Sequence, residues 1–502
     1  MSTKRYILSL DQGTTSSRSI LIDETGKIIG KSQKEFKQYY PNPSWVEHDP
    51  QEIWNTQIET ARNVISESKV DPKNIACIGI TNQRETIVAF DSETGKPVYN
   101  AIVWQCRRTA EFCNGLKLKY KKLIKEKTGL EIDAYFSASK MKWILDNVPD
   151  AKELANVRAR HGTPLLRFGT IDSWLIWNLT GGKSFYTDPS NASRTMLFNI
   201  KENKYDSELL KIFGIEEWML PKVIPSNGDF GLTDKKIFGH EIPIQAVLGD
   251  QQAALFGQCC FKEGDLKVTY GTGGFLLINI GNKLQFNDNF LTTIAWDCKG
   301  APWHAPVYAL EGSTFISGAI IQWLRDGLGI IKDSTESEKI AISLNSNEGV
   351  YLVPALVGLG APYWDQGARG TIIGITRGTT KAHLVRAAIE SMAYQIADLI
   401  LPVKNKLPKD TFIKTDGGAA KNNFLMQFQA DLLQMPVTRS SQVEATAIGV
   451  AYLAGLNIGF WKSTDELQKM WHPDELFLPK ANREEEYKRW KEAVKRALGW
   501  EI

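Results

Sequence analysis

Residues 7–23 read ILSLDQGTTSSRSILID, two apolar runs separated by a polar turn that contains a glycine. Residues 265–281 read DLKVTYGTGGFLLINIG and repeat the same order of apolar run, glycine turn and apolar run. Short apolar runs on either side of such a turn are typical of β-hairpins. Because residues 271–273 stand where the first copy has residues 13–15, the sequence predicts a duplicated fold with one hairpin in each half.

Both turns have the composition of phosphate-binding loops. Backbone N–H groups in a tight turn point into a small concavity, glycine permits close approach, and the hydroxyls of Thr14, Thr15 and Thr272 add donors. Asp11 would repel a phosphate unless a cation lay between them, which predicts Mg²⁺ beside this carboxylate. A plain β-turn is the alternative for either stretch alone, and the pairing of the two favours phosphate.

The bulk composition limits the possible partners. The chain has 502 residues, of which 43% are hydrophobic and 23% charged, so two or three globular domains are expected. A net charge of +3 gives no reason to expect a nucleic-acid or membrane partner. Six cysteines without CxxC pairs indicate a reducing compartment, and no run of about 18 apolar residues occurs. We therefore expect a soluble, cytoplasmic protein.

Strand and helix signals alternate along the chain, as in α/β proteins. Three strands are expected in an antiparallel meander within residues 6–36, then a helix over 53–65 and a buried central strand over 74–81. A later helix is expected over 384–399. The reset of the pattern near residue 265 places a domain boundary, which predicts a first domain over 1–255 and a second over 256–502.

Several common catalytic motifs are absent. GGKS at 181–184 lacks the leading glycine of a Walker A loop and is interpreted as a turn, and GTGGFL at 271–276 fails the dinucleotide fingerprint. The DFG at 229–231 has no HRD or VAIK companion, and no GxSxG is present. The six histidines also lack metal-ligand spacing. Together these absences disfavour protein kinases, serine hydrolases and zinc enzymes.

Eight motifs, in the same order along nearly the whole chain, carry a resemblance to a known family. They are DQGTTSSR (11–18), TNQRET (81–86), WQCRRT (104–109), SASKMKW (137–143), GDQQAALFGQ (249–258), YGTGGF (270–275), SGAIIQWLRD (317–326) and TDGGAAKNNF (415–424). Together they resemble the FGGY family of carbohydrate kinases, and in particular its glycerol-phosphorylating members. The resemblance implies a duplicated actin-like, hexokinase-like and Hsp70-like ATPase fold, with a catalytic cleft between two α/β domains.

The resemblance also implies the reaction, its cofactors and the catalytic residues. The expected reaction is transfer of phosphate from ATP to glycerol with Mg²⁺, giving sn-glycerol 3-phosphate, in a homodimer or homotetramer. Asp250 is the expected general base, because an alcohol is a weak nucleophile at neutral pH. Asp11 and Asp250 would face the metal, and Arg18 would stabilise charge. Taken alone, Asp250 would be a helix N-cap and Arg18 a surface arginine.

The acceptor and nucleotide sites follow in the same way. Arg84 and Glu85 would hold vicinal hydroxyls, with a structural salt bridge as the alternative. Trp104, Tyr135 and Phe275 would enclose the carbon chain beside Gln251. The resemblance assigns the nucleotide to Thr14, Thr15, Ser16, Gly271, Thr272, Gly318, Gln322, Gly417, Gly418, Ala419 and Asn422. Close helix packing is the alternative for Gly318, and a solvated polar position for Asn422.

Two departures and two alternative functions remain. Gly274 replaces a cysteine common in similar sequences, and residues 226–243 contain no arginine where some bacterial members carry a loop that binds a sugar bisphosphate, so this form of inhibition is not expected. One alternative function is an FGGY kinase acting on a longer polyol or keto sugar. The other is an ATPase of the actin or Hsp70 type without a small-molecule acceptor.

Overall fold

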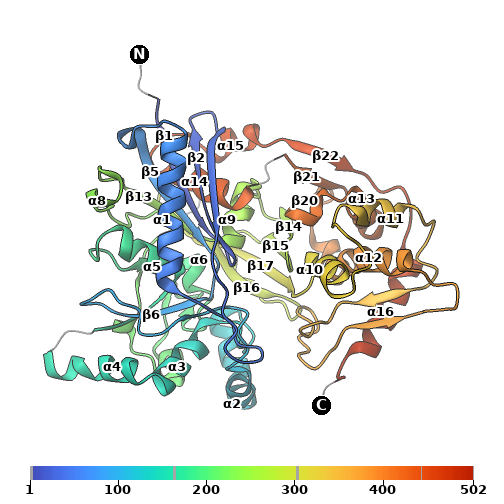
Figure 1. The fold of residues 1–502 in the computed structure, drawn as a ribbon, viewed down its shortest axis with the longest axis horizontal. Helices are drawn as coiled ribbons and strands as arrows, with labels where there is room; N and C mark the ends of the chain where they lie inside the picture. Colours follow the sequence, from blue (N-terminus) through green and yellow to red (C-terminus); the bar gives the residue numbers. More distant parts are fainter. Residues whose placement is uncertain (1–3, 162–164, 301–304, 442–443, 501–502) are drawn as a thin grey trace.

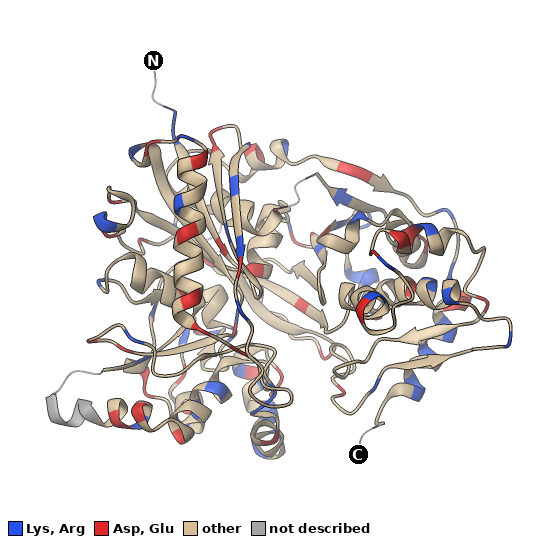
Figure 2. Cartoon of the chain, viewed as in Figure 1, with Lys and Arg blue, Asp and Glu red and all other residues tan. Residues whose placement is uncertain are grey.

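The computed structural model describes residues 4–161, 165–300, 305–441 and 444–500. Two α/β halves lie side by side, each built around one large sheet (Figure 1). Lysines, arginines, aspartates and glutamates are interspersed over the helices and strands of both halves (Figure 2). None of the described helices is both long and apolar enough to cross a membrane.

The first sheet has the strand order β13-β5-β1-β2-β3. Its strands are β1 (Tyr6–Gln12), β2 (Ser16–Asp23), β3 (Ile28–Glu35), β5 (Ile75–Asn82) and β13 (Ile244–Gly249). β1, β2 and β3 pair antiparallel, whereas β5 is parallel to both β1 and β13. The predicted meander and the predicted buried central strand are therefore both confirmed.

The second sheet repeats this topology. Its order is β16-β17-β15-β14-β20-β21-β22, from β14 (Leu266–Tyr270), β15 (Gly274–Asn279), β16 (Leu291–Trp296), β17 (Val307–Thr314), β20 (Ile413–Asp416), β21 (Val437–Ser440) and β22 (Pro473–Phe477). β14 and β15 form an antiparallel hairpin, β17 continues it, and β20 and β21 follow in parallel on the other side of β14. The strands β17-β15-β14-β20-β21 thus correspond one by one to β3-β2-β1-β5-β13, which confirms the predicted duplication.

Equivalent helices follow equivalent strands. α1 (Pro50–Glu67) precedes β5 and α12 (Lys381–Ile400) precedes β20, as the apolar periodicities predict. Asp49 caps α1 by accepting a hydrogen bond from the backbone N–H of Gln51. α9 (Asp250–Gly257) follows β13, α14 (Ala445–Asn457) follows β21, and these two helices pack on each other between the sheets (Figure 1).

The C-terminal part of the chain returns to the first half. Ile448, Val450 and Leu453 of α14 share a buried apolar core with Ile7 and Ile20 of the first sheet. α14 contacts β1, β2, β5 and β13, while α1 packs on β1, β2 and β3. The first sheet is therefore covered on both faces, which explains why β5 is apolar along nearly its whole length.

Smaller elements complete the two halves. Beneath the first sheet lies a four-stranded sheet of β4 (Glu47–His48), β7 (Ala101–Ile102), β6 (Ile87–Asp91) and β8 (Leu166–Thr170), with α2 (Ala110–Thr128), α3 (Ser137–Asn147), α4 (Pro149–His161) and α5 (Ile171–Leu179). The remaining described strands and α-helices of the first half are β9 (Tyr186–Thr187), α6 (Pro189–Ala192), β10 (Phe198–Asn199), β11 (Lys204–Tyr205), α7 (Ser207–Phe213), β12 (Lys222–Val223) and α8 (Lys235–Phe238). The second half adds α10 (Gly318–Gln322), α11 (Glu336–Ile342), β18 (Tyr351–Val353), β19 (Thr371–Ile373), α13 (Asn423–Leu433), α15 (Thr464–Met470) and α16 (Glu484–Ala497).

Candidate active site

In both predicted hairpins the first glycine of the turn donates a backbone hydrogen bond across the turn. The backbone N–H of Gly13 donates to the carbonyl of Ser16, and that of Gly271 donates to the carbonyl of Gly273, both at 3.0 Å. Trp104 connects the first hairpin to the second half, since its indole N–H donates to Thr14 Oγ1 at 2.9 Å and its ring lies 6.4 Å from that of Phe275 on β15. Trp104 therefore contacts the first hairpin directly and the second hairpin through the ring of Phe275.

Three aromatic residues predicted for the acceptor meet in one cluster. The ring centroids of Trp104 and Tyr135 lie 5.6 Å apart in an edge arrangement, and Phe275 contacts Trp104 from the second sheet. Tyr135 is almost fully buried, and its hydroxyl lies 3.5 Å from Arg84 Nη2. The three rings come from distant parts of the sequence, so their convergence gives one apolar wall beside a guanidinium.

Arg84 is 2% exposed and lies just beyond the end of β5. Its Nη1 donates to Glu311 Oε2 at 2.6 Å, and its Nη2 donates to Glu311 Oε1 at 3.0 Å. Its Nε lies 3.1 Å from Asp250 Oδ1 without hydrogen-bond alignment, and has no acceptor within the described chain. Arg84 thus takes part in salt bridges, as its alternative interpretation required, and its buried Nε–H lies beside Asp250 without an aligned hydrogen-bond acceptor.

Glu85 has a backbone conformation that few non-glycine residues adopt. Its φ is +62°, directly after a buried strand, and its side chain is 1% exposed. Its Oε1 accepts a hydrogen bond from Arg194 Nε at 2.7 Å and lies 3.9 Å from Arg84 Nε. Burial raises the pKa of Glu85, although the charges of Arg84 and Arg194 oppose that rise. Left-handed backbone at such a position costs free energy and is common at ligand sites.

Asp250 stands at the junction of β13 and α9. Gly249 occupies the N-cap position and Asp250 is the first helical residue, so the N-cap alternative for Asp250 is wrong. A Cβ at Gly249 would lie 2.7 Å from the Arg84 side chain, which explains the glycine. The Asp250 side chain is 28% exposed beside the buried Arg84, and its Oδ1 accepts from the Gln251 N–H at 2.7 Å. A carboxylate with one accessible face next to a guanidinium can bind a hydroxyl and accept its proton.

Asp11 lies at the end of β1 and is 7% exposed. Burial raises the pKa of Asp11 to about 6, with Arg18 lowering it and Glu444 and Asp250 raising it. Arg18 Nη1 is 3.5 Å from Asp11 Oδ2 and also pairs with Glu444, so Arg18 bridges β2 and the loop before α14. It is therefore a partly buried member of a charge cluster, not an isolated surface arginine.

Ten of the eleven residues predicted for the nucleotide fall into two groups. A cavity of about 570 Å³ in the second half is lined by seven of them, which are Gly271, Thr272, Gly318, Gln322, Gly418, Ala419 and Asn422. Thr14, Thr15 and Ser16 belong to the other hairpin and do not line it, and the Ser16 hydroxyl accepts from Gln33 Nε2 at 3.0 Å. Cavities of this size hold nucleotides and drug-sized ligands.

Local geometry explains several of these positions. A Cβ at Gly318 would lie 2.7 Å from the carbonyl oxygen of Gly271, so the close-packing alternative holds for Gly318 even though it lines the cavity. Gly417 packs on the backbone of Tyr270, and Gly418 is in a short 3₁₀ turn ahead of α13. The α-helix begins after these glycines, where Asn422 caps α13 by accepting from the Leu425 N–H.

Sequence analysis missed three buried charged residues. Arg194 and Glu311 are both 0% exposed and pair at 2.9 Å, and Lys267 Nζ donates to Gln251 Oε1 at 2.5 Å. Burial lowers the pKa of Lys267 to about 8, against the opposing charges of Asp416 and Asp250. A single Glu within the otherwise uncharged strand VYALEGST was the available signal for Glu311.

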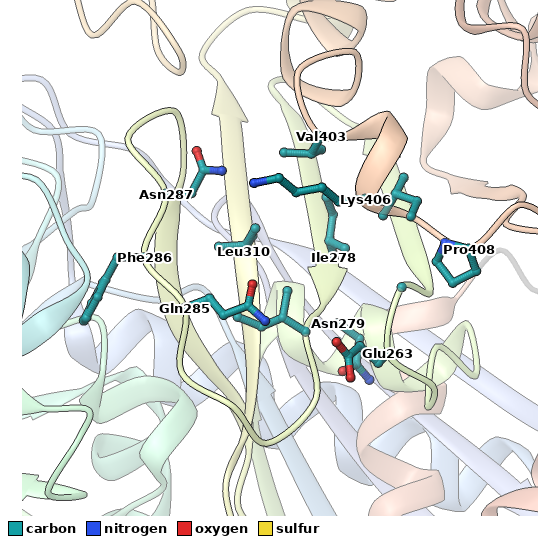
Figure 3. Close-up of a pocket in the computed structure, with 13 residues that line it drawn as sticks. Glu263, Ile278, Asn279, Gln285, Phe286, Asn287, Leu310, Val403, Lys406 and Pro408 are labelled. Carbon is teal, nitrogen blue, oxygen red and sulfur yellow. The ribbon is translucent and has the colours of Figure 1, made fainter.

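A second cavity, of about 500 Å³, contains none of the predicted residues. It lies beside the ends of β15 and β17, where Figure 3 shows Ile278, Leu310, Asn287 and Lys406 around it. Most of its polar lining is exposed, and its buried lining is apolar except for Asn279. The described part of the chain also has no group of three or more His, Cys, Asp or Glu side chains that could hold a metal ion.

Comparison with known proteins agrees with this geometry. Residues 6–257 match the N-terminal domain, and residues 266–458 the C-terminal domain, of the FGGY family of carbohydrate kinases. The chain belongs to this family. It is 57% identical to glycerol kinase 2 of Thermotoga maritima and 56% identical to glycerol kinase of a Thermoanaerobacter species, each over 99% of both chains.

Solved structures give the same assignment of fold. The crystal structure of Plasmodium falciparum glycerol kinase with ADP matches with a TM-score of 0.89 and 36% identity, over 99% of this chain and 98% of that one. Gluconate kinase of Lactobacillus acidophilus matches with a TM-score of 0.83 at 22% identity, over 99% and 97% of the chains, which shows a shared fold alone. The predicted two-domain, actin-like α/β fold is confirmed.

Proposed function

We propose that this chain transfers the γ-phosphoryl group of ATP to glycerol, giving sn-glycerol 3-phosphate. Relatives with the name glycerol kinase are 54–57% identical to it along the whole chain, which supports this acceptor over longer sugars. The observation that carries the proposal is the contact between Arg84 Nε and Asp250 Oδ1 beside the aromatic cluster. A donor without an aligned hydrogen-bond acceptor and a partly exposed carboxylate, beside an apolar wall, suit a small polyol.

Asp250 acts as the general base in this proposal. A hydroxyl oxygen of glycerol attacks the γ-phosphorus, its proton passes to the Asp250 carboxylate, and the bond from phosphorus to the β–γ bridging oxygen breaks to leave ADP. Arg84 Nε–H orients the acceptor, with Glu85 and Gln251 close to it. Trp104, Tyr135 and Phe275 pack on the carbon chain and restrict how the hydroxyls enter. Arg18 offsets negative charge near Asp11.

The nucleotide would bind the second half. The adenosine part would occupy the cavity bordered by Gly318, Gln322 and Asn422, and the phosphates would meet the turns that carry Thr14, Thr15 and Thr272. Arg325 also lines this cavity from a π-helical turn that continues α10. Gly271, Gly417, Gly418 and Ala419 would let the backbone approach the ligand closely.

Mg²⁺ fits the residues present. The ion is commonly held by one or two carboxylates together with substrate phosphates, and Asp11 and Asp250 supply two that repel each other. Asp11 has its pKa raised by burial and by neighbouring carboxylates, so a cation beside it would relieve that repulsion. When bound, Mg²⁺ would neutralise charge on the β- and γ-phosphates. We also propose a cytoplasmic homodimer or homotetramer with domains 1–255 and 256–502.

The proposal is tested by ADP release from MgATP with purified protein. Glycerol, xylulose, gluconate and no acceptor are compared, and the phosphorylated product is identified by NMR. We expect strong glycerol-dependent release and sn-glycerol 3-phosphate. Faster ADP release with a longer sugar would be consistent with the fold but would refute glycerol as the acceptor. Slow ADP release at the same rate with and without every acceptor would favour an ATPase without a small-molecule acceptor.

A further inference from the structure

Arg84, which we propose to orient the acceptor, is held by a carboxylate from the other half of the molecule. Arg84 follows β5 of the first sheet, whereas Glu311 belongs to β17 of the second. Both guanidinium termini of Arg84 donate to the two oxygens of Glu311, at 2.6 and 3.0 Å. A bidentate pair of this kind fixes the plane of the guanidinium as well as its position.

The second sheet offers Glu311 no cation of its own at the paired positions. Its in-register neighbours on the adjacent strands are Leu277 and Leu291, and its nearest polar neighbour on β17 is the Ser313 hydroxyl, which donates at 3.2 Å. The cations that form ion pairs with it, Arg84 and Arg194, both come from the first half, and Lys267 on β14 of the second sheet adds a weaker charge interaction. Burial acts to raise the pKa of Glu311, but Arg194 and Arg84, with a smaller contribution from Lys267, hold it at about 2. Glu311 is therefore ionised, and its charge is compensated across the interface between the halves.

The buried network balances its charge without Asp250. Two arginines, Arg84 and Arg194, face two glutamates, Glu85 and Glu311, and all four are at most 2% exposed. Arg194 connects the two glutamates, donating from Nε to Glu85 and from Nη2 to Glu311. Asp250 remains the additional, partly exposed carboxylate, free to bind a hydroxyl. Because Glu311 occupies the terminal nitrogens of Arg84, the guanidinium turns its Nε edge toward Asp250.

We propose that Glu311 is a positioning residue for the acceptor site, which fixes Arg84 from the second sheet and makes glycerol affinity depend on how the two halves are placed. The inference rests on the function proposed above. Glu311 acts through Arg84 and Arg194 and does not itself touch the acceptor. Separation of the halves would remove both Glu311 acceptors and leave the Arg84 terminus to Gln252 Oε1 and to a closer ion pair with Asp250. Glycerol would then lose both its donor and its base.

The test compares Glu311→Gln with the wild type. Glutamine keeps the shape but puts an N–H₂ group against an arginine, so one guanidinium N–H loses its acceptor. We expect KM for glycerol, and Kd from calorimetry with glycerol alone, to rise about tenfold or more, because a hydrogen bond between charged groups is lost. KM for MgATP should change less than about twofold. Glu311→Asp, which keeps the charge on a shorter side chain, should fold and raise KM for glycerol about threefold or more.

Glu390→Gln is the matched control. Glu390 is equally buried in the second half and accepts from Arg386 Nε at 2.7 Å, but it lies on α12 within that half. It should lower Tm and leave KM for glycerol unchanged. The inference is overturned if Glu311→Gln and Glu311→Asp both keep KM and Kd for glycerol within about twofold of the wild type. If Glu311→Gln does not fold, Glu311→Asp alone decides. Wild-type protein without glycerol-dependent ADP release would refute the proposed function instead.

Discussion

Gly257 of α9 and Gly449 of α14 bring the backbones of their helices into direct contact. A Cβ at Gly449 would lie 1.8 Å from the carbonyl oxygen of Ala253 and 2.7 Å from the backbone nitrogen of Gly257. In turn, a Cβ at Gly257 would lie 2.0 Å from the carbonyl oxygen of Ala445. α9 and α14 occupy equivalent places in the two copies of the fold, so the halves meet through a reciprocal glycine contact.

Gly449→Ala should destabilise the protein by about 2–3 kcal/mol, because the added methyl group meets backbone and the helices must separate. Urea unfolding at fixed pH measures this change. Since the helices join the halves, we also expect the catalytic rate to fall before the protein unfolds. An unchanged unfolding midpoint would contradict the close contact.

Gly115→Ala provides the control for helix propensity. Gly115 lies within α2, and a Cβ there would meet no atom within 4 Å. Alanine at such a site should stabilise the protein by about 0.5–1 kcal/mol, because glycine loses more backbone entropy on folding. Because Gly449→Ala should lower the free energy of unfolding and Gly115→Ala should raise it, the two variants distinguish a steric clash from a change in helix propensity.

The duplicated fold was predictable because its signal is local. Each hairpin is encoded by adjacent apolar runs and a glycine turn, and the second copy needs only the same pattern again. The contact between Gly257 and Gly449 was not predictable in this way. Each glycine by itself is merely a weak helix residue, and what makes it necessary is a helix distant in sequence.

The residues of the candidate site also fall into those with a local sequence signal and those without one. Asp250, Arg84 and Trp104 stand in motifs that resemble the family, so the sequence alone identifies them as candidate site residues. Glu311 and Arg194 are charged residues whose partners come from other elements, and neither lies in a local sequence pattern that predicts its burial. Their role depends on tertiary pairing, which periodicity and spacing do not encode.

Stability should depend on pH through Asp172, a fully buried carboxylate at the start of α5. Burial raises the pKa of Asp172 from 3.8 to about 7, and the hydroxyls of Thr170 and Thr187 lower it only in part. Because the folded state binds the proton more tightly than the unfolded state, this contribution is favourable below about pH 4 and is lost as pH rises through about 7.

Asp172→Asn removes this titration. Relative to the wild type, the variant should gain roughly 2–4 kcal/mol of unfolding free energy between pH 4 and pH 8, since one pKa unit corresponds to about 1.4 kcal/mol. Denaturant unfolding of both proteins at several pH values measures the difference. A constant difference across this range would show that Asp172 keeps an ordinary pKa in the folded protein.

Gly418→Ala tests whether Gly418, which lines the nucleotide cavity, is needed for ligand binding and not for folding. Gly418 is exposed, and a Cβ there would have no neighbour within 4 Å, so Tm should not change. The same methyl group would project where the nucleotide is proposed to approach the backbone. We expect KM for MgATP to rise about fivefold or more, with KM for glycerol unchanged, as loss of ground-state binding predicts. An unchanged KM for MgATP would place the nucleotide away from this glycine.

Asp250→Asn should remove the proposed base while keeping the fold. The amide oxygen can still accept from the Gln251 N–H, but an amide does not take a proton from the acceptor hydroxyl. We expect kcat to fall about 10²-fold or more, because general-base catalysis contributes on this scale, while the Kd for ATP remains close to that of the wild type. Single-turnover ADP release and calorimetry measure the two quantities. Near-normal turnover would mean that the proton leaves by another route, and would limit Asp250 to its electrostatic contact with Arg84.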